Sequence, residues 1–217
     1  MGKQWMRQEI KKNEIANYLG KATEWAMQNR QRTLGIGGGI LAALLLVVFV
    51  VHQLFKNRET AWEKLAFAQS FAYQGQPDKA MEQIKVLEDQ FSQTPASGFG
   101  TLFAGDLLYR QGRFKEAAEV YQRLLDRQTP KPALPIAMSD VGISQEAAGD
   151  CKSAADTDQR FLDTYPDHFL APQVHASLAR CLDVLGMKDK AKAAYERMAL
   201  LYPDSYWAQW AQSKLKS

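Results

Sequence analysis

Residues 112–117 read GRFKEA, and this frame, a glycine followed five positions later by an alanine, occurs four times in the chain. The other copies are GQPDKA at 75–80, GDCKSA at 149–154 and GMKDKA at 186–191, so successive glycines are 37 residues apart. A fixed period of this size is typical of repeat architectures, which more often bind other proteins than catalyse reactions. The sequence therefore predicts a function carried by a surface.

Further positions repeat in step with these glycines. A small residue stands seven positions before each glycine, and a Tyr-Pro pair closes the last two units. Apolar residues at spacings of three and four within each half-unit predict two amphipathic helices per unit. The glycine is expected to end the first helix with positive φ, and the small residue to let two helices cross closely. The small residues are Ala68, Gly105, Gly142 and Ala179, and the units are 61–97, 98–134, 135–171 and 172–208.

This pattern resembles the tetratricopeptide repeat, which spaces an early small residue, a central alanine, an aromatic residue and a late proline in the same order. The resemblance covers residues 61–208. It departs at Asp158, where an aromatic is expected, and at Ser92 and Thr129, where the late proline is expected. It implies an all-α fold, a solenoid of four helix pairs closed by a C-terminal capping helix over 205–217.

The resemblance also implies where a partner would bind. In proteins with these repeats the first helix of each unit lines a concave groove. The aromatic and charged residues at the matching positions suit an extended or helical peptide. For any single one of them, an ordinary solvated face is the alternative. The implied groove residues are Trp62, Gln69, Tyr73, Phe99, Asp106, Tyr109, Arg110, Ile143, Glu146, Arg180 and Asp183.

A long apolar run precedes the repeats. Residues 33–55, TLGIGGGILAALLLVVFVVHQLF, carry no formal charge, and thirteen of the 21 positions from 34 to 54 are Leu, Ile, Val or Phe. A helix of 21 residues reaches ~31 Å, the thickness of a bilayer core, so we expect a single transmembrane helix. A cleaved signal peptide would need a shorter apolar core. Small residues that could pack two membrane helices together, although such ridges also occur without function, are Gly35, Gly39 and Ala43.

Charge is divided unevenly across this span. Residues 1–32 carry seven Lys or Arg and three Glu, whereas residues 56–217 carry 20 basic and 21 acidic residues. A short basic segment prefers the cytoplasmic side, so we expect the tail to stay inside and the repeat domain 56–217 to be exported. Residues 10–32 also predict an amphipathic helix that rests on anionic lipid or docks a cytosolic partner. The near-neutral repeat domain lacks the basic footprint typical of nucleic-acid binding.

The sequence contains no motif that indicates catalysis, a cofactor or a metal. The histidines, His52, His168 and His175, lack metal-ligand spacing, and no nucleophile elbow or phosphate-binding loop occurs. A catalytic site would have to be assembled from Asp106, Glu146 or His175, and we expect a non-enzymatic protein without a cofactor.

Cys151 and Cys181 are the only cysteines. In an oxidising compartment they could pair, and equally they could be small buried hydrophobic residues. Since a disulfide needs a Cα separation below ~7 Å that the sequence does not establish, we favour unpaired thiols.

The order of short tail, one span and exported repeats resembles the bacterial family of ancillary subunits of the Sec translocon. The segments YPDHFLAP at 165–172 and YPDSYWAQ at 202–209 are also similar to bacterial envelope members of the repeat superfamily. The resemblance implies an inner-membrane scaffold whose periplasmic repeats associate with the translocon and a membrane-anchored periplasmic chaperone during protein export. The alternatives are an envelope-assembly or cell-wall coordination factor, and an import-receptor-like protein whose anchored repeats face the cytosol.

Overall fold

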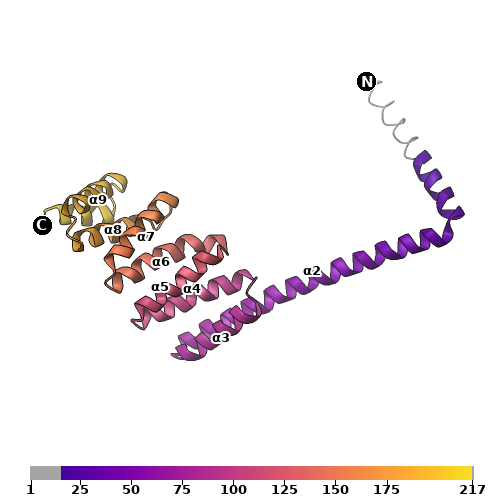
Figure 1. Ribbon diagram of the computed structural model, residues 1–217, viewed down its shortest axis with the longest axis horizontal. Coiled ribbons are helices and arrows are strands. Elements are labelled where there is room, and N and C mark those ends of the chain that lie inside the picture. Colours follow the sequence, from indigo (N-terminus) through magenta and orange to yellow (C-terminus); the bar gives the residue numbers. More distant parts are fainter. Residues whose placement is uncertain (1–15, 217) are drawn as a thin grey trace, which may run out of the picture. The chain divides into compact units, whose positions relative to one another are not determined.

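The computed structural model describes residues 16–216, which form helices and contain no β-strand (Figure 1). The chain divides into two compact units, Met1–Lys56 and Asn57–Ser217. In the first unit, residues 16–28 are helical and a turn at Asn29 separates them from the next helix. The amphipathic helix expected over 10–32 is therefore described only from residue 16 onward. In the part from Asn57 onward, paired helices stack in series, which confirms the expected all-helical solenoid.

The repeat units each consist of two antiparallel helices joined by a tight turn. The C-terminal part of α2 is the first helix of unit one, and α4, α6 and α8 are the first helices of the following units (Figure 1). The second helices are α3, α5, α7 and α9, and α10 closes the stack. The bounds are α2 Arg30–Tyr73, α3 Pro77–Gln90, α4 Pro95–Arg110, α5 Phe114–Arg127, η1 Lys131–Ala133, α6 Leu134–Ala147, α7 Cys151–Thr164, α8 Ala171–Val184, α9 Lys188–Leu201 and α10 Tyr206–Lys216.

The repeated glycines end the first helices as the sequence predicts. All four have φ between 73° and 82°. At each one the glycine N–H bonds to the carbonyl three residues back, and the next N–H bonds to the carbonyl five residues before it, as in Gly112 to Tyr109 and Arg113 to Leu108. This is the Schellman arrangement, which satisfies the last free carbonyls of a helix and requires a left-handed residue. The glycines are Gly75, Gly112, Gly149 and Gly186.

The small residues of the first helices lie where the second helices cross them, as predicted. Ala68 and Ala179 are fully buried. A β-carbon at Gly142 would lie 2.2 Å from Oδ1 of Asp158, which is itself buried in the third unit. The buried core runs along these crossings, and the repeated alanines Ala80 and Ala154 are also fully buried in it. Backbone proximity therefore replaces side-chain bulk at the centre of each unit.

The capping helix α10 covers the end of the stack. Ala211 is fully buried against a small core that includes Tyr195 of α9, and the ring of Trp210 meets Tyr195 edge-on with centroids 5.6 Å apart. Gln209, Gln212 and Lys216 remain exposed on the opposite side. One apolar and one polar face are what the terminal element of a solenoid needs.

The apolar run that precedes the repeats is helical, and no other described part of the protein packs against it. Residues 34–59 are all exposed, including thirteen Leu, Ile, Val or Phe side chains between 34 and 54. Among the described residues, α2 is the one helix long and apolar enough to cross a membrane. A β-carbon at Gly35 or Gly39 would meet nothing within 4 Å, so the small-residue ridge is open.

Candidate functional site

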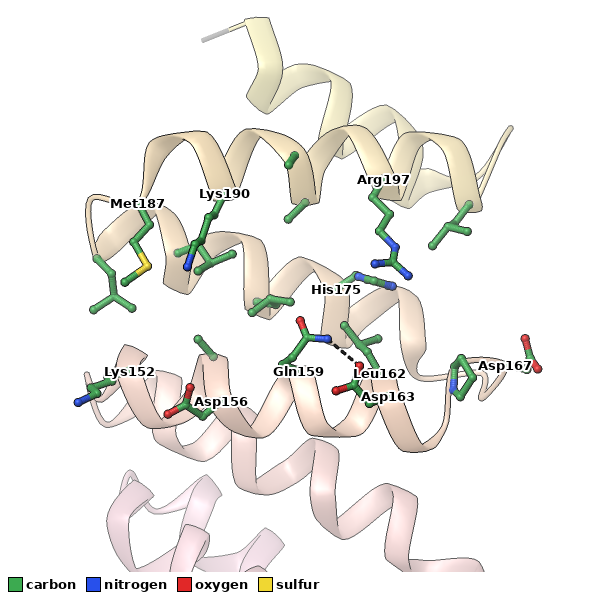
Figure 2. A pocket seen from close by; sticks show the side chains of 18 residues that line it. Lys152, Asp156, Gln159, Leu162, Asp163, Asp167, His175, Met187, Lys190 and Arg197 are labelled. Carbon is green, nitrogen blue, oxygen red and sulfur yellow. Dashed lines mark hydrogen bonds between the residues drawn. The ribbon is translucent and has the colours of Figure 1, made fainter.

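Repeat units three and four are more closely packed on one side than on the other. The first helices α6 and α8 contact each other directly. The second helices α7 and α9 are instead separated by a pocket of about 620 Å³ whose floor is α8 (Figure 2). In units three and four the first helices therefore lie closer together than the second helices. The exposed side of the first helices is the surface on which the sequence predicts a partner.

A pocket of about 420 Å³ lies on this surface between α4, α6 and α8, and we call it the first-helix pocket. Four of the eleven predicted groove residues come together here, and four further residues complete the lining. The predicted ones are Asp106, Tyr109, Arg110 and Ile143, and the others are Tyr121, Asp140, Ser144 and Gln173.

The chemistry of the first-helix pocket centres on two carboxyl groups. Tyr121 donates a hydrogen bond from its hydroxyl to Oδ1 of Asp106 at 2.6 Å. Burial raises the pKa of Asp106, while this hydrogen bond and the charge of Arg110 oppose the rise. Burial, together with the nearby Asp106, raises the pKa of Asp140 to about 7. A cationic side chain entering the pocket would relieve the repulsion between the two carboxylates.

The structure distributes the other predicted groove residues over separate places. Trp62 of α2 and Phe99 of α4 form an aromatic pair with ring centroids 5.7 Å apart. Gln69 and Tyr73 are exposed on α2 outside the pocket. Asp183 of α8 pairs with Lys188 at 2.6 Å, at the turn into α9.

Glu146 and Arg180 are predicted groove residues that bind each other. Arg180 donates from Nε and Nη2 to the two oxygens of Glu146, at 2.6 and 2.7 Å, and Ser177 donates to the same carboxylate at 2.9 Å. The guanidinium of Arg180 also lies 5.8 Å from the ring centroid of Trp210. This two-pronged pair links α6 to α8, and the aromatic contact links α8 to the cap. Both residues therefore hold units three and four together.

Sequence reasoning missed half of the pocket lining. Gln173 stands 13 residues before Gly186, the position that Trp62 and Phe99 hold before their own glycines, so the repeat register contained a signal for it. The repeat register places an aromatic residue at Tyr121, but its hydroxyl bond to Asp106 depends on the angle between α4 and α5. Asp140 and Ser144 carried no signal in the sequence pattern.

The residues from which a catalytic site would have to be built lie apart. Asp106 bonds to Tyr121, Glu146 bonds to Arg180, and His175 lines the pocket between α7 and α9. Cys151 and Cys181 are buried free thiols. Within residues 16–216 no three His, Cys, Asp or Glu side chains gather in a group that could hold a metal.

The fold defines a helical repeat protein, and the two pockets described above are clefts between its helices. Comparison with protein families agrees: a tetratricopeptide repeat model matches residues 65–132 and 102–169, and a second tetratricopeptide repeat model matches residues 177–205. The chain therefore carries tetratricopeptide repeats. Such repeats are typically non-enzymatic scaffolds for protein–protein interaction, and neither model describes an enzyme.

Solved structures show the same fold. The chain is similar to a Podosopora anserina protein assigned as a kinesin light chain with nearly identical TPR-like repeats, with 14% identity, a TM-score of 0.56, and coverage of 70% of this chain and 82% of that one. A single-residue variant of that protein is similar with a TM-score of 0.57, at the same identity and coverage. A search of curated proteins gave no match. At this identity the likeness concerns the fold alone.

Proposed function

We propose that the protein is a membrane-anchored scaffold of the bacterial inner membrane, with its N-terminal tail in the cytoplasm and its repeats in the periplasm. The apolar part of α2 would cross the bilayer, because residues 34–54 are exposed, apolar and long enough for a bilayer core. The basic residues before the span favour this orientation. The repeats would associate with the Sec translocon and with a membrane-anchored periplasmic chaperone during protein export, as the sequence resemblance implies.

The first-helix pocket is the observation that carries the scaffold role. It combines the partly exposed side chains of Tyr109 and Ile143 with the carboxyl groups of Asp106 and Asp140. Aromatic and aliphatic surface beside convergent acidic groups suits a protein segment that inserts a Lys or Arg side chain. A pocket of about 420 Å³ is large enough for one such side chain and its neighbours.

Partner capture tests this proposal. We expect the full chain, crosslinked in native membranes and purified in mild detergent, to recover translocon or chaperone subunits. The double variant Asp106→Asn/Asp140→Asn removes both pocket carboxyl groups at constant shape and should reduce recovery. A matched control, Asp89→Asn/Asp126→Asn, makes the same charge change on the second helices α3 and α5, at exposed positions. Good bait yield without either class of partner would overturn the proposal.

Topology is tested separately by proteolysis. Protease added to the periplasmic side of intact inner membranes should digest residues 57–217 and leave a protected N-terminal fragment. Digestion of the repeats from the cytosolic side would contradict the proposed orientation and favour an import-receptor-like arrangement.

A further inference from the structure

We propose that the pocket between α7 and α9 is a second docking site, and that its occupant is an amphipathic helix from another protein, basic along one flank and acidic along the other. This site lies on the second helices, away from the first-helix pocket. We call it the second-helix groove (Figure 2). It measures about 620 Å³ and is the larger of the two.

Three helices each give one continuous face to the second-helix groove. On α7, α8 and α9 the lining residues recur at spacings of three, four and seven, so they lie along single helical stripes. The α7 stripe runs from residue 152 to residue 163, which corresponds to a length of ~17 Å or about three helical turns. The lining residues are Lys152, Ala155, Asp156, Gln159, Leu162 and Asp163 on α7, His175, Leu178 and Leu182 on α8, and Lys190, Ala193, Ala194, Arg197 and Leu201 on α9.

The floor and ends of the groove are apolar and partly open to solvent. Leu178 is buried at the base, whereas Leu185, Met187 and Leu201 are 39%, 44% and 47% exposed. His175 also lines this floor. Burial and the nearby Arg197 lower the pKa of its imidazole to about 4, so the side chain is neutral and adds no charge to the floor. Exposed leucine and methionine along a concave strip are typical of a surface that receives an apolar partner.

The two walls carry opposite charges in matching register. Asp156 and Asp163 stand seven residues apart on α7, and Lys190 and Arg197 stand seven residues apart on α9 (Figure 2). None of these four takes part in an ion pair between described residues. The Oδ1 atom of Asp163 accepts a bond from Gln159 at 2.8 Å. Lys152 also lines the groove, at the first residues of α7, so the acidic part of the α7 wall is the stretch from Asp156 to Asp163. The groove thus separates this acidic stretch of α7 from a basic wall on α9.

A spacing of seven on both walls matches the heptad period with which charges recur on the flanks of a coiled coil. In a coiled coil, apolar residues of the incoming helix fill the seam, and charges on its two flanks pair with the neighbouring helices once per heptad. A helix with a leucine-rich seam would cover the floor. Its basic flank would face α7 and its acidic flank α9. An extended peptide would not repeat its side chains every two helical turns and fits this register less well.

Binding of a designed helix to the full chain in detergent micelles tests the chemistry of the site. The probe is a fluorescein-labelled peptide of about three heptads with leucine in the seam, lysines on one flank and glutamates on the other. A second peptide carries glutamate on both flanks. We expect the mixed peptide to bind the wild-type chain at least ~10-fold more tightly than the all-acidic one, because the latter places like charges against α7.

Charge reversal supplies the decisive variant. Asp156→Lys/Asp163→Lys makes both walls basic and should reverse the preference, so that the all-acidic peptide binds more tightly. Asp89→Lys/Asp126→Lys makes the same charge change outside the groove and should leave the preference as in the wild type. Equal effects of the two double variants, or an unchanged preference in the groove variant, would overturn the proposal.

The natural occupant is identified by photo-crosslinking in native membranes from Met187, at the mouth of the groove. We expect the crosslinked peptide to come from another protein and to have the heptad pattern with unlike flanks. A crosslink to residues of this chain, to a second copy of it or to lipid would overturn the proposed source. Because Asp106→Asn/Asp140→Asn leaves the groove intact, failure at the first-helix pocket is distinguishable from failure here.

Discussion

Gly105 and Tyr121 lie so close that a β-carbon at position 105 would be 2.3 Å from Cε1 of the Tyr121 ring. The first stands seven residues before the glycine of unit two, and the second stands nine after it. The same two positions meet in unit three, where Gly142 faces Asp158. Contact between them sets the distance between the paired helices.

Replacing Gly105 with alanine should destabilise the repeat domain. The ring of Tyr121 is 2% exposed and cannot move aside, so we expect a loss of about 2–3 kcal/mol in unfolding free energy. Thermal unfolding followed by circular dichroism measures it. In the background Tyr121→Leu, which frees space beside position 105, the added cost of Gly105→Ala should be smaller. Additive effects of the two substitutions would contradict the contact.

The turn glycines should be sensitive for a different reason. A β-carbon at Gly149 meets nothing within 4 Å, yet its φ is +82°. Gly149→Ala should therefore cost about 1–2 kcal/mol from backbone conformation alone. Gly149→Asn should cost less, because asparagine tolerates the left-handed region. Equal losses for alanine and asparagine, measured by the same thermal unfolding, would show that φ does not set the cost.

Asp158 should make stability depend on pH. Burial raises its pKa from 3.8 to about 7. An acid whose pKa is higher in the folded state stabilises the fold at low pH, and this contribution is lost as pH rises from about 4 to about 7. Asp158→Asn should therefore stabilise the protein by about 1–3 kcal/mol at pH 8 and by a clearly smaller amount at pH 5, where only part of the loss has developed.

The comparison of variant with wild type at each pH isolates this residue. Asp140, whose pKa is also raised, and His175, whose pKa is lowered, titrate in both proteins. Asp126→Asn makes the same chemical change at an exposed position and is the control for the substitution itself. A stabilisation by Asp158→Asn that is the same at pH 5 and pH 8 would show that the charge of Asp158 is not its source.

The two thiols should react slowly in the folded protein. Cys151 and Cys181 are 8% and 0% exposed, and burial together with a hydrogen bond to Cys151 raises the pKa of the Cys181 thiol. Since only the thiolate attacks alkylating reagents, iodoacetamide at pH 8 should modify both residues much faster in denaturant than in native protein. Mass spectrometry of timed samples measures the rates. Similar rates under the two conditions would mean that the thiols are accessible.

The repeat register accounts for most of what the sequence predicted correctly. The positive φ of the four glycines, the close crossing at Gly105 and Gly142, and the all-helical solenoid follow from local spacing, because each concerns residues within one helix pair. Asp158 was recognised as a departure from the aromatic position, and its burial beside Gly142 gives that departure a physical consequence.

Contacts between units were not predictable in the same way. Glu146 and Arg180 were placed in the groove individually. Their ion pair joins residues that are 34 positions apart in the sequence, and it depends on how units three and four stack. Asp156 and Lys190 carried no signal in the sequence, because a periodic pattern does not reveal that two second helices form opposite walls of a pocket. Sequence spacing assigns residues to helix faces, and the angle between units decides which faces meet.

The most direct test of the scaffold is photo-crosslinking from Ile143, in the first-helix pocket, in living cells. The account predicts that a photoreactive residue there crosslinks to a translocon or chaperone subunit, and that Asp106→Asn/Asp140→Asn weakens this crosslink. A photoreactive residue at Glu82, exposed on α3, should give no such product. Full-length protein at normal yield with no partner crosslinked from Ile143, or equal crosslinking from both positions, would contradict it.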